Sequence, residues 1–304
     1  MPDPAPTQRQ PAPLLPPDGA PIWRGLALAL GAAFTGATSP IFAKVIYADG
    51  GSILGTLSGR FLIGGALLWT YVLLAGKRPR FGRHFLAVIL MGMLGNAMQS
   101  LFYYSALTRI PASLAGLLLS TTPVYVVVLA RLLYGEPITL LKLVALAGAL
   151  AGIATIVGFS PVAVDFTGVA LAAGCALVFS LYIVTGRRLL FEISPLELAA
   201  GVLPAAGLTF LVLGLITDSI VLPATAQGRA ALLALGVLPT ILANFLWLSG
   251  IRALGASRSA LAGISEPVFV VLLSAALLGE RLGPVQAVGA VVVLTCMLIL
   301  RWVR

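Results

Sequence analysis

Charged residues are scarce in this sequence. Only 10% of its 304 residues are Asp, Glu, Lys or Arg, whereas 60% are hydrophobic, and the mean hydropathy is +1.06. Soluble domains use about 25% charged residues to cover their surface. The scarcity therefore excludes a soluble globular protein and predicts an integral membrane protein.

Cysteine and histidine are almost absent. Cys175 and Cys296 fall inside apolar runs, so we expect them to pack and not to form a disulfide or a metal site. His84 follows Arg83 in a basic loop, where a solvated side chain is expected. No G-x-x-x-x-G-K-[ST], HExxH or GxSxG pattern occurs, which excludes an ATP-driven pump and disfavours a membrane enzyme. No cofactor is expected.

Long apolar runs are plentiful. Each is about 18 to 24 residues long, enough to cross a hydrocarbon core of roughly 30 Å as a helix. They lack the alternating pattern of a β-barrel strand. The sequence therefore predicts an all-α integral membrane protein in a lipid bilayer, with ten transmembrane helices over 23–46, 52–74, 85–107, 112–134, 140–157, 167–185, 196–216, 230–248, 256–278 and 284–303.

The proline-rich residues 1–21 have no apolar core of signal-peptide length and are predicted to be a disordered cytoplasmic tail. The net charge of +9 could suggest nucleic acid, but the basic residues follow a membrane topology instead. One side of the ten spans holds Arg9, Arg24, Lys77, Arg78, Arg80, Arg83, Arg131, Lys142, Arg187, Arg188, Arg252, Arg258, Arg301 and Arg304. The other side holds only Lys44, Arg109, Arg229 and Arg281. Both termini are therefore expected in the cytoplasm, and the protein in the inner (plasma) membrane.

The chain contains an internal repeat. Residues 105–136 align with 249–280 at a constant offset of 144 residues, which pairs Ser105 with Ser249, Ser113 with Ser257, Pro123 with Pro267 and Gly135-Glu136 with Gly279-Glu280. A unit of five spans inverts its second copy in the membrane. We therefore predict two inverted repeats over 22–158 and 166–304, with a binding site between them, as in transporters.

Polar side chains form matching stripes in the two copies. Asn96, Ser100 and Tyr103 share one helix face, with Gln99 beside them. Their equivalents at the same offset are Thr240, Asn244 and Trp247. Both stripes are predicted to line a central cavity for a small-molecule substrate, or else to hydrogen-bond helix to helix.

Two further residues are candidates for the same cavity. Thr38 lies on the first span and Tyr182 on the sixth. The alternatives are bonding of the Thr38 hydroxyl to its own helix and ordinary packing of Tyr182.

Glu266 lies near the middle of the ninth span, where an isolated carboxylate costs about 2.5 to 3.5 kcal/mol. Burial disfavours the charged form of a carboxyl group, which makes Glu266 a candidate for proton coupling and for binding a substrate amine. The alternatives are a permanently protonated acid that bridges helices and a salt bridge to Arg60. Arg60 itself either snorkels to the outer surface or binds an anionic ligand.

Pro123 and Pro267 are matched prolines inside apolar spans. Each removes a backbone donor, which deprives the carbonyls of Leu119 and Gly263 of their helix partners. These kinks either hinge the two halves or serve packing alone. The Gly-Glu pairs are interpreted as duplicated loop structure with a solvated acid, not as a site.

The segments TTPVYVVVLARLLYGEPIT and SEPVFVVLLSAALLGERLG resemble the paired EamA modules of the drug/metabolite transporter superfamily. The resemblance covers about residues 22 to 303 and implies export of a small metabolite by alternating access across the bacterial inner membrane. Amino-acid exporters of YddG type look like the nearest functional analogues, and a monomer is expected. A flippase of the same fold, for a lipid or lipid-linked molecule, is the main alternative.

Overall fold

The chain is helical throughout the part that the structure describes. The computed structural model describes residues 22–77, 79–134, 139–158, 164–189, 192–254, 263, 265–281 and 283–302, and these contain no strand. The predicted tail and Gly135-Glu136 lie outside the described residues, as does most of 256–264. The elements are α1 (Ile22–Ala48), α2 (Ile53–Leu74), η1 (Gly82–His84), α3 (Phe85–Leu90), η2 (Met91–Ala97), α4 (Met98–Leu107), α5 (Ala112–Leu119), α6 (Thr122–Tyr134), α7 (Leu140–Gly158), α8 (Phe166–Leu189), α9 (Pro195–Ile216), α10 (Ala226–Val237), η3 (Leu238–Leu242), α11 (Ala243–Leu254), α13 (Ser265–Leu278) and α14 (Pro284–Trp302).

The helices are long and apolar enough for a membrane. Within the described residues, seven helical runs satisfy the length and composition of a span, and shorter apolar helices lie at Leu143–Gly152, Ser265–Leu278 and Pro284–Cys296. Large apolar side chains point outward, among them Leu74, Leu140 and Ile216. Such a surface requires lipid around it. The predicted class, an all-α multi-pass membrane protein, is confirmed, and the count of ten spans stays a prediction.

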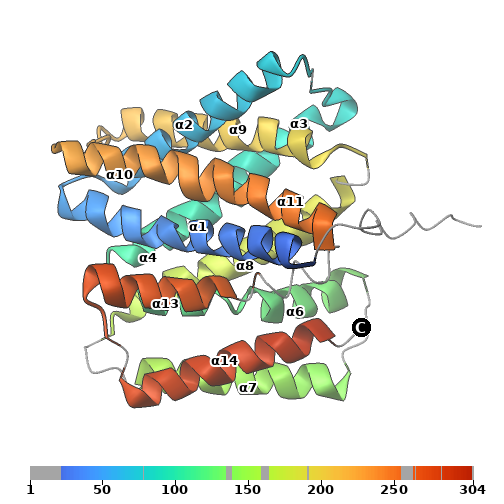
Figure 1. Ribbon diagram of the computed structural model, residues 1–304, viewed down its shortest axis with the longest axis vertical. Helices are drawn as coiled ribbons and strands as arrows, with labels where there is room; N and C mark the ends of the chain where they lie inside the picture. The colour runs from blue at the N-terminus through green and yellow to red at the C-terminus, as the bar shows by residue number, and fades with distance from the viewer. Residues whose placement is uncertain are drawn as a thin grey trace, which may run out of the picture.

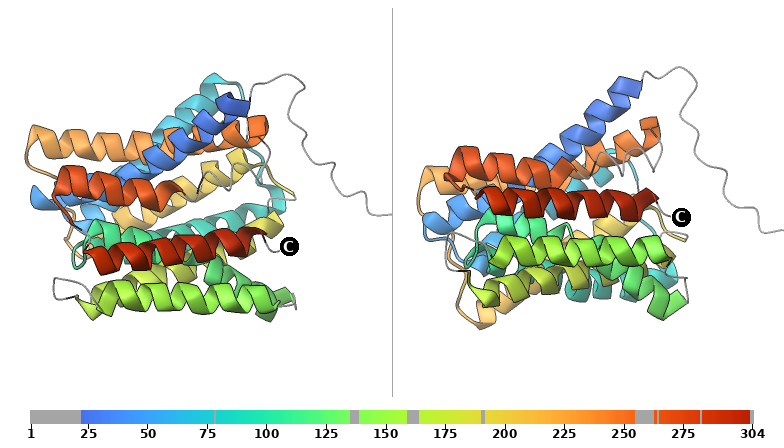
Figure 2. Two further views of the ribbon diagram at one scale, coloured as in Figure 1. Left: turned by 60° about the horizontal axis from the view of Figure 1, so that its bottom comes forward. Right: turned by 90° about the horizontal axis from the view of Figure 1, so that it is seen from below.

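Helices from the two halves of the sequence pack against each other. The main pairs are α1 with α11, α2 with α9, α4 with α8 and α7 with α14, and α13 packs on both α1 and α5. Each of these pairs joins one helix from each half. Figures 1 and 2 show α7 and α14 side by side along one edge of the bundle, with the C-terminus at the same end as the end of α6.

The 144-residue offset carries structural elements onto one another. It maps Leu140–Gly158 onto Pro284–Trp302, so the bounds of α7 and α14 coincide. It also brings α4 onto α11 and α8 onto α1 within a few residues. This agreement is what a duplicated unit would give; the repeats and the inversion of the second copy stay predictions.

Two π-helical segments occupy nearly equivalent places, η2 before α4 and η3 before α11. In η3, Pro239 offers no N–H to the carbonyl of Leu235, and the Thr240 hydroxyl donates to that carbonyl at 3.0 Å instead. In η2 no proline is present, and glycines bring the backbone against other helices. A Cβ on Gly92 would lie 2.6 Å from Ala205 Cβ of α9. Wide turns of this kind are common at functional sites.

Pro204 is a second proline whose freed carbonyl receives a side-chain donor. Pro204 inside α9 leaves the Ala200 carbonyl without its helix donor, and Trp69 Nε1 of α2 donates to that oxygen at 2.9 Å. Trp69 therefore ties α2 to α9.

The centre of the bundle is aromatic. Tyr104, Phe61 and Phe210 are among the largest fully buried side chains. The rings of Phe61 and Phe210 stack with centroids 5.9 Å apart, which joins α2 to α9 beside the cavity described next.

Candidate functional site

A cavity of about 600 Å³ lies among α1, α4, α6, α8 and α13. One part of its wall is apolar and includes Leu119, Val126, Phe179, Ile183 and Val270. The polar wall consists of Ser39, Arg60, Asn96, Gln99, Ser100, Tyr103, Tyr104, Ser120, Thr122 and Glu266. The cavity therefore combines one acid, one base and several hydroxyl and amide groups with a surface for an apolar group.

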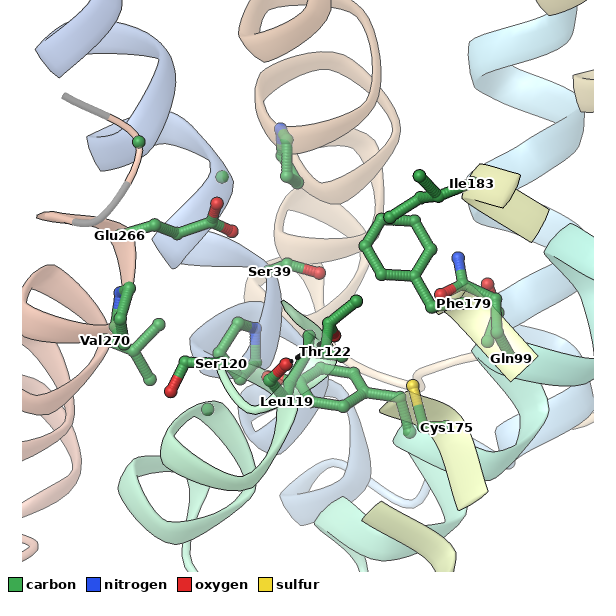
Figure 3. Close-up of a pocket in the computed structure, with 18 of the residues that line it drawn as sticks. Ser39, Gln99, Leu119, Ser120, Thr122, Cys175, Phe179, Ile183, Glu266 and Val270 are labelled. Carbon is green, nitrogen blue, oxygen red and sulfur yellow. Dashed lines mark hydrogen bonds between the residues drawn. The ribbon is translucent and has the colours of Figure 1, made fainter. Parts of the chain in front are cut away.

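Glu266 belongs to the first turn of α13 and points its carboxylate toward the middle of the pocket (Figure 3). The side chain is accessible, and no hydrogen bond or ion pair joins it to another described residue. The positive end of the α13 dipole favours a negative charge at this position. Gly36 makes room for the carboxylate, because a Cβ there would lie 2.9 Å from Glu266 Oε1.

Arg60 enters the cavity from α2 and does not snorkel to the surface. Its Nε donates to Thr240 Oγ1 at 3.0 Å, and its Nη1 donates to Tyr104 Oη at 2.6 Å and to Ser39 Oγ at 3.4 Å. The guanidinium also lies 5.4 Å from the Tyr104 ring centroid. Among the described residues no carboxylate lies within ion-pair distance of Arg60, so the alternative of a salt bridge to Glu266 is not realised.

The polar stripe of the first half lines the cavity. Asn96, at the end of η2, and Gln99, Ser100 and Tyr103 on α4 all contribute to its wall. Gln99 Nε2 donates to Asn96 Oδ1 at 3.1 Å, which fixes the two amides relative to each other. Gln99 lies across the pocket from Glu266, beside Phe179 (Figure 3).

The stripe of the second half lies behind the wall or beside it. Thr240 is buried and holds Arg60, and Asn244 Nδ2 donates to the Thr240 carbonyl at 2.6 Å. The six-membered ring of Trp247 packs against Gly263, which itself lines the cavity. The structure thus brings Thr240 and Trp247 next to residues of the wall without making them part of it.

Thr38 and Tyr182 also fall outside the wall. The Thr38 hydroxyl donates to the Thr35 carbonyl at 2.6 Å, the back-bonding that was the alternative for this residue. Tyr182 stacks on Phe179 with centroids 6.2 Å apart and packs against Gly95 of η2. It therefore supports an aromatic residue that does line the pocket.

Prolines lie along the wall of the cavity. Pro40, Pro123 and Pro267 line it, as do Gly36, Leu119 and Gly263, the residues four positions earlier. Pro40 lies inside α1, so it removes the N–H that the Gly36 carbonyl would have received. Pro123 and Pro267 instead lie in the first turns of α6 and α13, where a backbone N–H has no acceptor within the helix, so the predicted loss of a helix partner at Leu119 and Gly263 is wrong. The Thr122 hydroxyl donates to Leu119 O at 2.6 Å. Gly36 lies beside the Glu266 carboxylate.

The comparison with known families decides the identity of this helical bundle. The model of the EamA-like transporter family matches the chain twice, over residues 23–158 and 166–302. The chain belongs to the EamA-like transporter family. The predicted family is therefore confirmed, and this EamA-like protein is a multi-pass membrane transporter.

Individual relatives agree with the family. The aromatic amino acid exporter YddG of Ancylobacter novellus is 30% identical over 262 residues, which is 83% of each chain. The protein PecM of Dickeya dadantii is 23% identical over 70% of this chain and 73% of its own length. A solved crystal structure superposes with a TM-score of 0.65 at 24% identity, over 90% of this chain and 97% of the other, and shows the same fold.

Several wall residues of this EamA-like transporter were not among the substrate-binding residues predicted from sequence. Tyr104 lies one residue beyond the stripe that ends at Tyr103, yet both rings reach the cavity, with centroids 5.9 Å apart. Ser39 precedes a proline in an apolar span, a pattern that signals a polar kink. Phe179 carried no signal beyond its four-residue spacing from Cys175, which also lines the cavity. Among the described residues no cluster suited to a metal ion occurs.

Proposed function

We propose that this EamA-like transporter exports a small metabolite that carries a primary ammonium group and an apolar part, such as an amino acid. The observation that carries the proposal is an accessible carboxylate, Glu266, without a partner in the described chain, in a cavity of about 600 Å³. An intramembrane acid of this kind is a functional site by default. The name of the Ancylobacter relative, an aromatic amino acid exporter, supports the same class of substrate.

The acceptors around Glu266 suit an ammonium group. A primary ammonium has three N–H donors. The carboxylate accepts one or two of them, and the carbonyl of Gly36, which Pro40 deprives of its helix donor, is available for another. The apolar wall around Phe179 and Ile183 lies across the pocket and suits the side chain of the substrate (Figure 3).

Glu266 also suits proton coupling. A carboxyl group in this position binds either a proton or the substrate ammonium, so that the two compete. Since the sequence has no phosphate-binding loop for ATP, exchange of substrate for protons is the coupling that we propose. Asn96, Gln99, Ser100 and Tyr103 then bind the remaining polar groups of the substrate.

Alternating access is the proposed mechanism. Two inverted halves, 22–158 and 166–304, rock about the cavity, with both termini in the cytoplasm and the chain in the inner membrane. The matched prolines Pro123 and Pro267 are the proposed hinges. Thr240, Asn244, Trp247, Tyr182 and Thr38 support the cavity from the helices around it.

The test is uptake and counterflow of a labelled metabolite panel in proteoliposomes at two external pH values. We expect wild-type protein to transport at least one amino acid, with a pH dependence that Glu266→Gln abolishes together with transport. Glu192→Gln is the matched control, because it makes the same chemical change in an exposed loop. Full activity of Glu266→Gln would contradict the proposal, and transport of no soluble compound would favour the flippase.

A further inference from the structure

We propose that Arg60 binds the carboxylate of the transported molecule, so that the cavity holds a zwitterion between Arg60 and Glu266. This inference rests on the proposed function and deepens it. Glu266 alone would accept any small amine. A second, cationic pole would restrict the cavity to ligands that carry an anionic group as well.

The guanidinium of Arg60 is held in a fixed orientation by neutral groups. Thr240 accepts from Nε, while Tyr104 and Ser39 accept from Nη1. Ser39 Oγ and Tyr104 Oη lie 2.9 Å apart and share a hydrogen bond of their own. Hydroxyl groups at these positions orient the planar fork but leave its positive charge uncompensated.

One edge of the guanidinium stays open. Nη2 carries two N–H donors, and no hydrogen bond from Nη2 to the described residues is present. Nη2 is not a buried unsatisfied atom either, since only Ser274 Oγ has that status in the described chain. Because Arg60 lines the cavity, the open edge is accessible to a ligand there. Since Nε and Nη1 are engaged, a carboxylate oxygen would accept from Nη2 in a charge-assisted hydrogen bond.

The charge of Arg60 calls for an anion. Cations within membrane spans usually pair with an acid or with a ligand. No Asp or Glu of the described chain lies within 4.0 Å of Arg60, so the described protein itself supplies no counter-charge. A substrate carboxylate would supply it only while the cavity is loaded.

The helix geometry behind Arg60 is built to orient it. Pro239 leaves the Leu235 carbonyl free, and the Thr240 hydroxyl donates its only proton to that oxygen. The lone pairs of Thr240 Oγ1 are thereby left for Arg60 Nε. Thr240 and Tyr104 are positioning residues in this account, and Arg60 is the residue that contacts the ligand.

The experiment compares ligands that differ only in the carboxylate. Binding of L-phenylalanine and L-leucine, and of the matching amines phenethylamine and isopentylamine, is measured by calorimetry on the full chain purified in detergent. The wild type is expected to bind each amino acid at least about tenfold more tightly than its amine. In Arg60→Gln that preference should fall to near one, while the affinity for the amines is unchanged.

Control variants separate ligand binding from folding. Arg60→Lys keeps the charge without the planar fork and should retain part of the preference. Tyr104→Phe keeps the ring but removes one acceptor, and should weaken amino acids without affecting amines. Arg109→Gln removes a basic residue that pairs with Asp165 outside the cavity and should change neither.

The outcomes are distinguishable. A preference for amino acids that survives in Arg60→Gln would overturn the role of Arg60 and leave the proposed function intact. Equal loss of amines and amino acids in Arg60→Gln would show a structural role and would overturn it as well. If the wild type bound none of the four compounds, both this inference and the proposed function would fail.

Discussion

Glu266 and Glu280 stand at opposite ends of α13 and have opposite surroundings. Glu280 accepts hydrogen bonds from Ala112 N at 2.7 Å, from Ser113 N at 2.9 Å and from Ser113 Oγ at 2.7 Å. Glu266 has no such partner in the described chain. The carboxylate of Glu280 thus serves structure, whereas that of Glu266 has no partner in the described chain and is the one that we propose to bind a ligand.

Glu280 caps a helix of the other half of the sequence. Its carboxylate binds the first N–H groups of α5, where the helix dipole favours a negative charge. Gly279, with a φ of +68°, ends α13 and turns the chain toward this contact. The sequence-based interpretation of Gly279-Glu280 as loop structure holds for the glycine, but the acid is a bridge between helices and is not merely solvated.

The different roles of Glu266 and Glu280 can be tested by the same Glu→Gln substitution at each position. Glu266→Gln should lower substrate affinity by about ten- to a hundredfold, since a charge-assisted bond to ammonium is worth roughly 1.5 to 3 kcal/mol. Its thermal unfolding in detergent should stay close to that of the wild type. Binding calorimetry and a melting curve on one preparation check both statements.

Glu280→Gln should show the reverse pattern. The amide replaces one of the two oxygens that α5 uses, so we expect a loss of about 1 to 2 kcal/mol of stability with an unchanged substrate affinity. Ser113→Ala, which removes a single bond to Glu280, should lose less. Equal affinity losses in Glu266→Gln and Glu280→Gln would erase the distinction between the two acids.

Gly36→Ala tests whether the position of the Glu266 carboxylate determines substrate affinity. The added methyl group would lie 2.9 Å from Oε1, so the carboxylate must move away from the ammonium position. We expect a loss of affinity of about tenfold. Gly31→Ala on the same helix is the control, because its Cβ would meet only Leu246 Cδ1 at 3.4 Å.

A third acid, Glu192, is expected to give the smallest effect. It pairs with Arg83 and His84 at the bundle surface. The hydrogen bond from Arg83 holds the pKa of the Glu192 carboxyl below its usual range. A lowered pKa in the folded state stabilises the protein above the pKa of the unfolded chain, and this contribution is lost as the pH falls through the folded value. Glu192→Gln should therefore reduce only the acid-side pH dependence of thermal stability, and transport should not change.

Sequence reasoning predicted the fold class and the first polar stripe because both depend on regular helical spacing. Asn96, Ser100 and Tyr103 all line the cavity, because Asn96 lies near the end of η2 and the other two continue along α4. Glu266 could be predicted because an acid within an apolar span is recognisable from the sequence, whatever the packing of the helices. The family followed from the paired segments that end in Gly-Glu.

The second predicted stripe, unlike the first, does not line the cavity, because the backbone register differs between the two helices. A constant offset places Thr240 like Asn96 only if both helices turn alike. The wide turn η2 covers Met91–Ala97, whereas η3 covers Leu238–Leu242 and contains Pro239. Side chains in and after these two segments therefore face different neighbours, and the Thr240 hydroxyl contacts Arg60. The direction of Arg60 likewise depends on three partners from three other helices, which no local pattern encodes.

Pro40 in the cavity wall has a consequence for how the site can be mapped. Main-chain oxygens survive every side-chain truncation, so an alanine scan across the wall would leave the carbonyl of Gly36 untouched. That carbonyl regains a helix donor only if Pro40, four residues downstream, is replaced by a residue that has an N–H. A proline whose side chain neither donates nor accepts a hydrogen bond therefore determines which main-chain acceptor the cavity can offer.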